Sequence, residues 1–261
     1  MLKFEAKDTA FRRNHVFQLG GRSLQKTGPL LMGILNITPD SFFSGSRITN
    51  ERELLDKAGL MLEQGADILD LGAVSTRPGA SDLGPEEEYS RLIPAIKLIV
   101  KHFPEAFLSV DTWRTEIARE ALEAGAFMIN DISGASFDTE MVDFIADKNV
   151  PYVMMHTTGR PSEMQNKALE AGEVLEAVIN FFRKQIDLFK RKGAQQLITD
   201  PGFGFGKTLN ANYVMLGRLR ELRLENYPQL VGLSRKSMIY KLLDETPESA
   251  LNGSTSLNTI A

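Results

Sequence analysis

Short apolar runs recur along the chain and alternate with stretches in which apolar residues recur at helical spacing. Each run is nearly continuous in Val, Ile, Leu, Met or Phe, which is typical of a strand buried on both faces. Predicted strands lie at residues 30–36, 67–73, 107–111, 127–133, 151–156, 196–202 and 229–235. Predicted helices lie within residues 50–66, 84–103, 113–126, 139–149, 173–194 and 210–224.

This alternation predicts a parallel sheet with helical crossovers. Seven or eight such units in 261 residues, without a linker, favour a (β/α)8 TIM barrel over a doubly wound sheet. Residues 15–28 have two glycines at their centre and predict a hairpin before the barrel. We therefore expect a single domain, 1–261, with an N-terminal extension and hairpin at 1–29 and barrel units one to seven at 30–261.

Composition restricts the partners and the compartment. The net charge is −4, which argues against a general nucleic-acid surface. The chain has no cysteine, so disulfides and thiolate metal sites are excluded and a reducing compartment is favoured. No apolar stretch approaches the roughly 18 residues that cross a bilayer, and the first residues lack the apolar core of a signal peptide. We expect a cytoplasmic protein with small-molecule partners and no membrane or nucleic-acid partner.

Polar residues follow nearly every predicted strand at its carboxyl end. In a (β/α)8 barrel these ends meet on one face, and that face holds the active site. Apolar strands that end in Asp or Asn therefore predict one shared site. The strand-end residues are Asn36, 75–81, Asp111-Thr112, Asn130-Asp131, His156, Asp200 and 234–237.

The segment DPGFGFGKT, residues 200–208, has the glycines and the Lys-Thr pair of a phosphate-binding loop but not its spacing. A phosphate-binding loop would need glycine at position 201, where the chain has Pro201. The dinucleotide-binding pattern also fails, because the third glycine comes one residue early. The loop is therefore expected to serve another ligand, with its glycines allowing sharp turns and close backbone approach.

Six motifs in this order resemble those of the dihydropteroate synthases. They are GILNITPDSF (33–42), STRPGA (75–80), SVDT (109–112), INDISG (129–134), DPGFGFGKT (200–208) and GLSRKSMI (232–239). The resemblance implies a barrel enzyme that joins 6-hydroxymethyl-7,8-dihydropterin diphosphate to 4-aminobenzoate, releasing diphosphate by dissociative substitution. It also implies a requirement for Mg²⁺, competition by sulfonamides and a homodimer.

The resemblance assigns the pterin site to Asp111, Asn130, Met155, Asp200 and Lys236, with Asp111, Asp200 and Lys236 as the catalytic residues. A carboxylate can accept two hydrogen bonds from a ring N–H and the adjacent amine of a pterin, and an amide offers both a donor and an acceptor. Structural roles are the alternatives: a helix cap for Asp111, a turn for Asp200, a loop contact for Asn130 and core packing for Met155.

The same resemblance implies an aminobenzoate and diphosphate site and a metal ligand. Asn36 is expected to supply an oxygen to Mg²⁺, which commonly combines few protein ligands with substrate phosphates and waters. Ser237, at the start of a predicted helix, is expected either to help bind a carboxylate or only to cap the helix. The implied aminobenzoate and diphosphate residues are Thr76, Arg77, Pro78, Phe205, Lys207, Ser234 and Ser237.

One motif of the family is not found. Its eighth strand ends in Arg-x-His, whereas this sequence ends at LNGSTSLNTIA, in what is expected to be the seventh helix. We expect the natural chain to continue for one more strand and helix. Two alternative functions stay open. The shared Asp/Asn/Asp pterin set allows a pterin domain of the methyltetrahydrofolate methyltransferase type, and the missing C-terminal motif allows a pterin-binding protein without catalysis.

Overall fold

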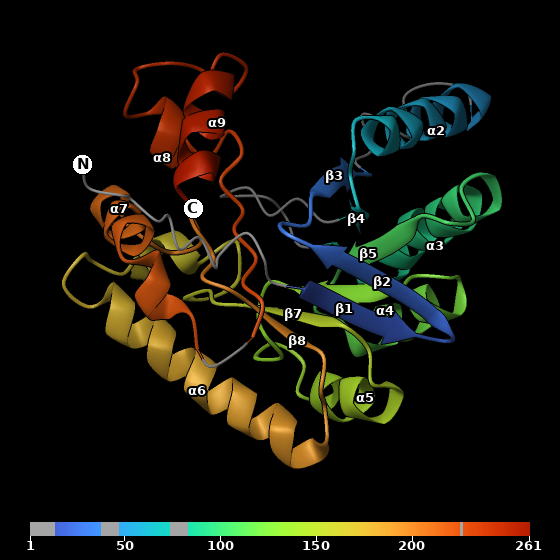
Figure 1. Cartoon of the computed structure of the whole chain (residues 1–261), viewed down its shortest axis with the longest axis horizontal. Helices are drawn as coiled ribbons and strands as arrows, with labels where there is room; N and C mark the ends of the chain where they lie inside the picture. Colours follow the sequence, from blue (N-terminus) through green and yellow to red (C-terminus); the bar gives the residue numbers. More distant parts are fainter. Residues whose placement is uncertain (1–13, 38–46, 74–82, 225–226) are drawn as a thin grey trace, which may run out of the picture.

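The computed structural model describes residues 14–37, 47–73, 83–224 and 227–261 (Figure 1). In these ranges the chain forms an antiparallel hairpin and a six-stranded parallel sheet, in which neighbouring strands follow the order of the chain. The hairpin strands are β1 (Asn14–Leu19) and β2 (Arg22–Thr27). The sheet strands are β3 (Met32–Asn36), β4 (Ile68–Gly72), β5 (Phe107–Asp111), β6 (Met128–Asp131), β7 (Tyr152–Met155) and β8 (Leu197–Asp200).

Helices connect the strands and lie along the outside of the sheet, from α2 beside β3 to α6 beside β8 (Figure 1). The described helices are α2 (Arg47–Glu63), α3 (Pro85–His102), α4 (Thr115–Glu123), α5 (Glu140–Lys148), η2 (Met164–Lys167), α6 (Val174–Lys192), α7 (Leu209–Gly217), η3 (Leu219–Leu222), α8 (Ser237–Tyr240) and α9 (Leu251–Ile260). None of them has the length and apolar character needed to cross a membrane.

The pleat of the strands decides which side chains face the site. Leu69 and Leu71 of β4 share one buried cluster with Ile96 and Ile99 of α3, so these strand residues face the helices. Because successive strand residues point to opposite faces, Asp70 between them faces the barrel interior. The same alternation holds for the next strands, where helix-facing residues precede the last interior residue: Val110 before Asp111, Ile129 before Asn130, Met154 before Met155.

The hairpin closes the amino end of the barrel interior. Phe17 and Leu24 share a buried cluster with Ile68, Met128 and Ile198, which lie in the first half of their strands. Gly20 and Gly21 form the turn with φ of 58° and 81°, as a two-residue hairpin of this type requires. The predicted hairpin and the first six predicted strands are therefore present, and the carboxyl ends of the strands are left for the site.

The prediction of a seventh strand at residues 229–235 is wrong. With the rest of the described chain this segment makes a single parallel bridge, Thr199 with Gln229, and the Leu230 N–H donates to Thr199 O at 2.8 Å. The chain then turns, since the Lys236 N–H donates to Leu233 O at 3.2 Å and Arg235 has φ of 51°. A left-handed residue ends an extended segment, and the apolar run could not reveal this turn.

Candidate active site

Interior side chains at the carboxyl ends of neighbouring strands form the centre of the candidate site. Asp111 of β5 is the register partner of Asn130 on β6. Met155 of β7 is likewise the partner of Asp200 on β8. The strand-end residues predicted for the pterin site thus come from four consecutive strands and lie at one end of the barrel.

Asp111 is a half-buried carboxylate among other acids. Burial raises its pKa well above the usual value, and the charges of Asp70, Glu88 and Asp131 raise it further. The alternative role as a helix cap is wrong, because the cap residue of α4 is Arg114. Asp111 is therefore available to a ligand, and a cationic ligand would relieve the repulsion that it experiences.

Within the ranges that the structure describes, the Asn130 side chain makes no hydrogen bond to loop backbone, which was its alternative role. Its amide Nδ2 donates to Asp70 Oδ2 at 2.9 Å. Burial raises the pKa of Asp70, the charge of Asp200 adds to that effect, and the nearby Ser109 and Asn130 groups oppose it. The pterin candidates are thus coupled to a further buried acid on β4.

Asp200 combines a local turn with a place in the site. Its Oδ1 accepts the Gly202 N–H at 2.8 Å, as the turn alternative expected. Its side chain is nevertheless close enough to Lys236 and Lys207 for both charges to lower its pKa against the larger, opposite effect of burial. The turn therefore fixes one carboxylate oxygen and leaves acceptor capacity on the other.

Lys236 lies opposite Asp200 and also contacts the glycine-rich loop. Its Nζ donates to Phe203 O at 2.6 Å and lies 4.9 Å from the centre of the Phe205 ring. Burial lowers the pKa of Lys236, and Asp200 opposes the shift. An ammonium has three donors, so Lys236 keeps hydrogen-bonding capacity for a ligand beside the Phe205 ring.

The loop at 200–208 is glycine-rich because it presses against the segment that follows β7. A Cβ on Gly202 would lie 2.1 Å from His156 O, and one on Gly206 would lie 1.7 Å from Thr158 Oγ1. Both residues also have positive φ, of 70° and 63°. The expectation of sharp turns and close backbone approach is confirmed.

Lys207 holds this loop from inside. It is buried, and its Nζ donates to three backbone carbonyls: His156 at 3.1 Å, Gly202 at 2.9 Å and Phe205 at 2.8 Å. Burial lowers its pKa to about 7. Because these carbonyls occupy all three donors of an ammonium, the arrangement speaks against direct contact between Lys207 and aminobenzoate.

An apolar wall borders the polar group. Met155 is buried with Trp113 and Ile132, and Phe205 packs against this cluster while remaining partly exposed. Met155 and Phe205 therefore lie where a flat ring held by the strand-end acids could be covered. The position of Met155 is compatible both with core packing and with a role as a pocket wall.

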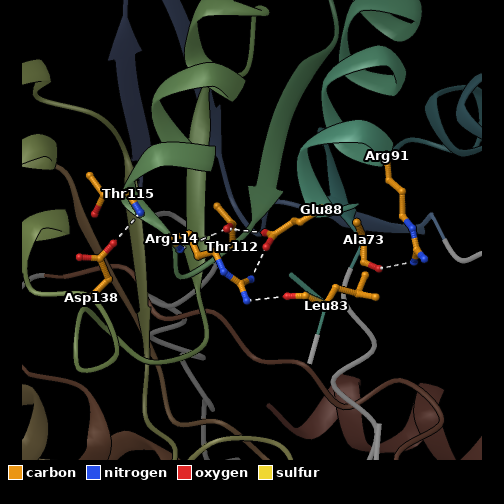
Figure 2. A network of polar contacts seen from close by, with 8 residues as sticks. All are labelled: Ala73, Leu83, Glu88, Arg91, Thr112, Arg114, Thr115 and Asp138. Atoms are coloured by element: carbon orange, nitrogen blue, oxygen red, sulfur yellow. Dashed lines mark hydrogen bonds and ion pairs between the residues drawn. The ribbon is translucent and has the colours of Figure 1, made fainter. Parts of the chain in front are cut away.

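A buried ion-pair network lies at Thr112, the residue after the end of β5 (Figure 2). Glu88 of α3 is fully buried, pairs with Arg114, and accepts from Thr112 Oγ1 at 2.6 Å. Arg114 also donates to Leu83 O at 2.7 Å. The network thereby connects α3, the residue after Asp111 and the start of α4.

Asn36 is exposed at the end of β3, beside a cleft of about 220 Å³ between β3 and α2. The described residues contain no cluster of three or more His, Asp or Glu side chains that could hold a metal ion. A single amide oxygen fits Mg²⁺ that takes its remaining ligands from a substrate and water.

The remaining residues predicted for the aminobenzoate and diphosphate site are Ser234, Ser237 and residues 76–78. Ser234 is exposed and Ser237 is half-buried. Ser237 is the first residue of α8, whose cap is Lys236, so its alternative as the cap residue is wrong. Helix α8 has four residues, too few for a strong helix dipole. Thr76, Arg77 and Pro78 lie outside the described residues.

Two acids of the site were missed in the sequence. Asp70 lies in the middle of an apolar strand rather than at its end, and Glu88 lies in a helix among neighbouring glutamates. The signal for Asp70 was present: an ionisable residue inside a continuous apolar strand is rarely buried without a partner. No comparable signal distinguished Glu88 from Glu86 and Glu87.

Known proteins resemble this chain over most of its length. The profile of the family described as pterin binding enzyme matches residues 32–261. The dihydropteroate synthase of Escherichia coli (strain K12) is 42% identical over 243 residues, covering 92% of this chain and 85% of the relative. The chain belongs to the dihydropteroate synthase family of pterin-binding enzymes.

Solved structures of the family agree with this fold. Dihydropteroate synthase of Xanthomonas albilineans with 4-aminobenzoic acid has a TM-score of 0.86 at 37% identity, covering 95% of this chain and 89% of that chain. The Yersinia pestis enzyme in complex with a sulfonamide drug has a TM-score of 0.85 at 36% identity, covering 95% and 90%. The (β/α)8 barrel class is confirmed, the chain is a transferase of folate synthesis, and the methyltransferase alternative is rejected.

His156 gives a testable link between the site and stability. Its side chain is 6% exposed and meets the Phe181 ring edge-on, and its Nδ1 has no hydrogen-bond partner among the described residues. Burial, and secondarily the charge of Lys207, lower its pKa from 6.5 to about 3. Because the folded pKa is below the unfolded one, the stabilisation by neutral His156 is complete above pH 6.5 and decreases as the pH falls toward 3.

We predict that the pH dependence of stability weakens in His156→Gln. At pH 5 the wild type should have lost about 2 kcal/mol of unfolding free energy from this group, which the variant cannot lose. Urea unfolding at pH 7.5 and pH 5 measures both proteins, with His102→Gln, an exposed histidine of α3, as the control. Equal pH slopes in wild type and His156→Gln would contradict a buried neutral imidazole.

Proposed function

We propose that this chain joins 6-hydroxymethyl-7,8-dihydropterin diphosphate to 4-aminobenzoate, with Asp111, Asn130, Asp200 and Lys236 as the pterin-binding residues. The observation that carries the proposal is the convergence of these side chains in the barrel interior of a dihydropteroate synthase family member. Asp200 accepts from the donor pair of the pterin, while Lys236 donates to its ring carbonyl.

The acids also suit the chemical step. As the carbon–oxygen bond to diphosphate breaks, the methylene carbon becomes electron-poor and its charge is shared with the pterin ring. The carboxylates of Asp111 and Asp200 already lie in the interior, where a positive charge is stabilised more strongly than in water. The aminobenzoate nitrogen then bonds to the methylene carbon and becomes a positively charged aryl ammonium. This group is acidic enough to give its proton to water or to the departing diphosphate, so no strong general base is required.

We assign Asn36 as the protein ligand of Mg²⁺. The ion, when bound, would neutralise the developing charge on the diphosphate leaving group. Phe205 of the glycine-rich loop serves the second substrate by covering the aminobenzoate ring, and the Nζ of Lys236 lies 4.9 Å from the centre of the Phe205 ring. Ser234 and Ser237 are assigned to its carboxylate.

A turnover assay tests the proposed function. The protein with both substrates and Mg²⁺ is expected to form dihydropteroate and diphosphate, and EDTA should stop the reaction until Mg²⁺ is restored. Asn36→Ala should raise the Mg²⁺ concentration for half-maximal rate about tenfold, by analogy with the loss of one ligand interaction. Tight pterin binding without turnover would instead support a pterin-binding protein without catalysis.

We also propose that the chain forms a homodimer through the α8–α9 region and works in the cytoplasm. Large apolar side chains are exposed there: Leu242, Leu243, Leu251 and Ile260. Such a patch commonly marks an interface. Sedimentation velocity is expected to give a dimer that Leu251→Glu with Ile260→Glu converts to a monomer. A monomeric wild type would overturn the assignment of this interface.

The proposal of a cytoplasmic protein is supported by the composition, because a chain without cysteine is compatible with a reducing compartment.

A further inference from the structure

Asp70 is buried inside a strand without the contacts that usually hold a structural carboxylate. It is 5% exposed and faces the barrel interior from the centre of β4. Asp131, a structural acid on β6, accepts four hydrogen bonds from Ser133, Ala135 and Tyr152. Among the described residues Asp70 accepts one, from Asn130. Ser109, its register partner on β5, is near enough to lower its pKa, but Asp70 Oδ1 and Ser109 Oγ have no hydrogen-bond partner among these residues.

The hydrogen bond between Asn130 and Asp70 fixes the orientation of the Asn130 amide. An asparagine amide presents nitrogen on one side and oxygen on the other, and its neighbours decide which way it points. A carboxylate accepts and does not donate, so the amide nitrogen of Asn130 must face Asp70. We propose that Asp70 is a positioning residue of the pterin site, which directs the Asn130 carbonyl oxygen toward the ligand.

The orientation of Asn130 has a direct consequence for recognition. Asp111 is the register partner of Asn130, so a ligand beside both meets a carboxylate and an amide oxygen. This pair of acceptors selects a heterocycle edge that carries N–H donors. A flipped amide would place its NH₂ against those donors and leave them unpaired. The inference rests on the proposed function, since the heterocycle is taken to be the pterin.

A double-mutant cycle tests whether Asp70 acts through Asn130. Calorimetry with 6-hydroxymethyl-7,8-dihydropterin measures wild type, Asp70→Ala, Asn130→Ala and the double variant. Asp70→Ala is expected to weaken binding about 10- to 100-fold, as for one charge-assisted hydrogen bond. In the Asn130→Ala background the same change should cost less than about threefold, because the two residues act as one unit.

Two further measurements separate positioning from folding. Thr199→Val removes a buried polar group from β8 and is expected to leave pterin affinity unchanged. If Asp70→Ala does not fold, Asp70→Asn keeps the volume but can donate as well as accept, and should weaken binding only when Asn130 is present. Equal losses with and without Asn130, or wild-type affinity in Asp70→Ala, would overturn the proposal. A wild type that does not bind the pterin would instead refute the proposed function.

Discussion

Asp200→Asn is expected to remove measurable pterin binding while the protein stays folded. The variant keeps an oxygen for the Gly202 N–H, which Asp200 Oδ1 now accepts at 2.8 Å, so the turn after β8 can persist. The other oxygen becomes an NH₂ group, which opposes the donor pair of a pterin. Lys236 also loses the charge that raises its pKa. We expect a loss of at least about 3 kcal/mol, roughly a hundredfold in affinity.

Calorimetry with a pterin ligand and urea unfolding together check this result. Asp138→Asn is the matched control, because Asp138 accepts the Thr115 N–H at 2.8 Å and has no place in the pterin site (Figure 2). The control should bind pterin as the wild type does. Unchanged affinity in Asp200→Asn would remove Asp200 from the site, and an unfolded variant would show that the turn depends on the carboxylate charge.

The prediction follows from the repulsion between buried carboxylates that the fold holds close together. Burial raises the pKa of Asp70, Asp111 and Asp200 alike, and the charges of these acids disfavour one another. Lys236 is a cation that opposes this effect at Asp200. Such an arrangement costs stability in the empty protein and is compensated when an electron-poor ligand enters. The site can therefore stabilise the positive charge that develops on the substrate during the reaction.

The sequence predicted the fold where the physical signal was local. Six strands were identified because burial on both faces requires nearly continuous apolar residues, as in β7. Residues 229–235 carry the same signal, yet their turn depends on contacts with distant segments: the Arg235 N–H donates to Ser254 Oγ at 2.8 Å. Apolar pattern does not encode such a contact.

The site was predictable in its positions and less so in its contacts. Strand-end polarity identified Asp111, Asn130 and Asp200, because a parallel barrel brings these ends together. The role of Lys207 could not be read in this way. Its three carbonyl partners are separated from it by up to 51 positions in the chain. Likewise, only packing of α3 against α4 shows that Glu88 meets Arg114.

Asp131→Asn is expected to cause the largest loss of stability. Asp131 is fully buried, and burial raises its pKa although donors from Tyr152, Ser133 and Ala135 oppose the shift. Its Oδ1 accepts from Ser133 N and Ser133 Oγ, each at 2.7 Å. Its Oδ2 accepts from Ala135 N at 2.8 Å and the Tyr152 hydroxyl at 2.6 Å. An amide nitrogen at either position would leave one backbone N–H without its acceptor, and it would force the neighbouring hydroxyl to turn and accept instead of donate.

One unpaired buried N–H, together with the loss of charge from the remaining hydrogen bonds, should lower the unfolding free energy by about 3 kcal/mol, measured by urea unfolding. Ala135 makes the loss harder to absorb, because its φ of 66° is held in part by this contact. Tyr152→Phe removes one donor and should cost only about 1–2 kcal/mol. In the double variant the phenylalanine removes a donor that would otherwise face the amide, so the combined loss should be smaller than the sum of the two. Strict additivity, or an Asp131→Asn protein as stable as the wild type, would mean that these donors do not depend on the carboxylate.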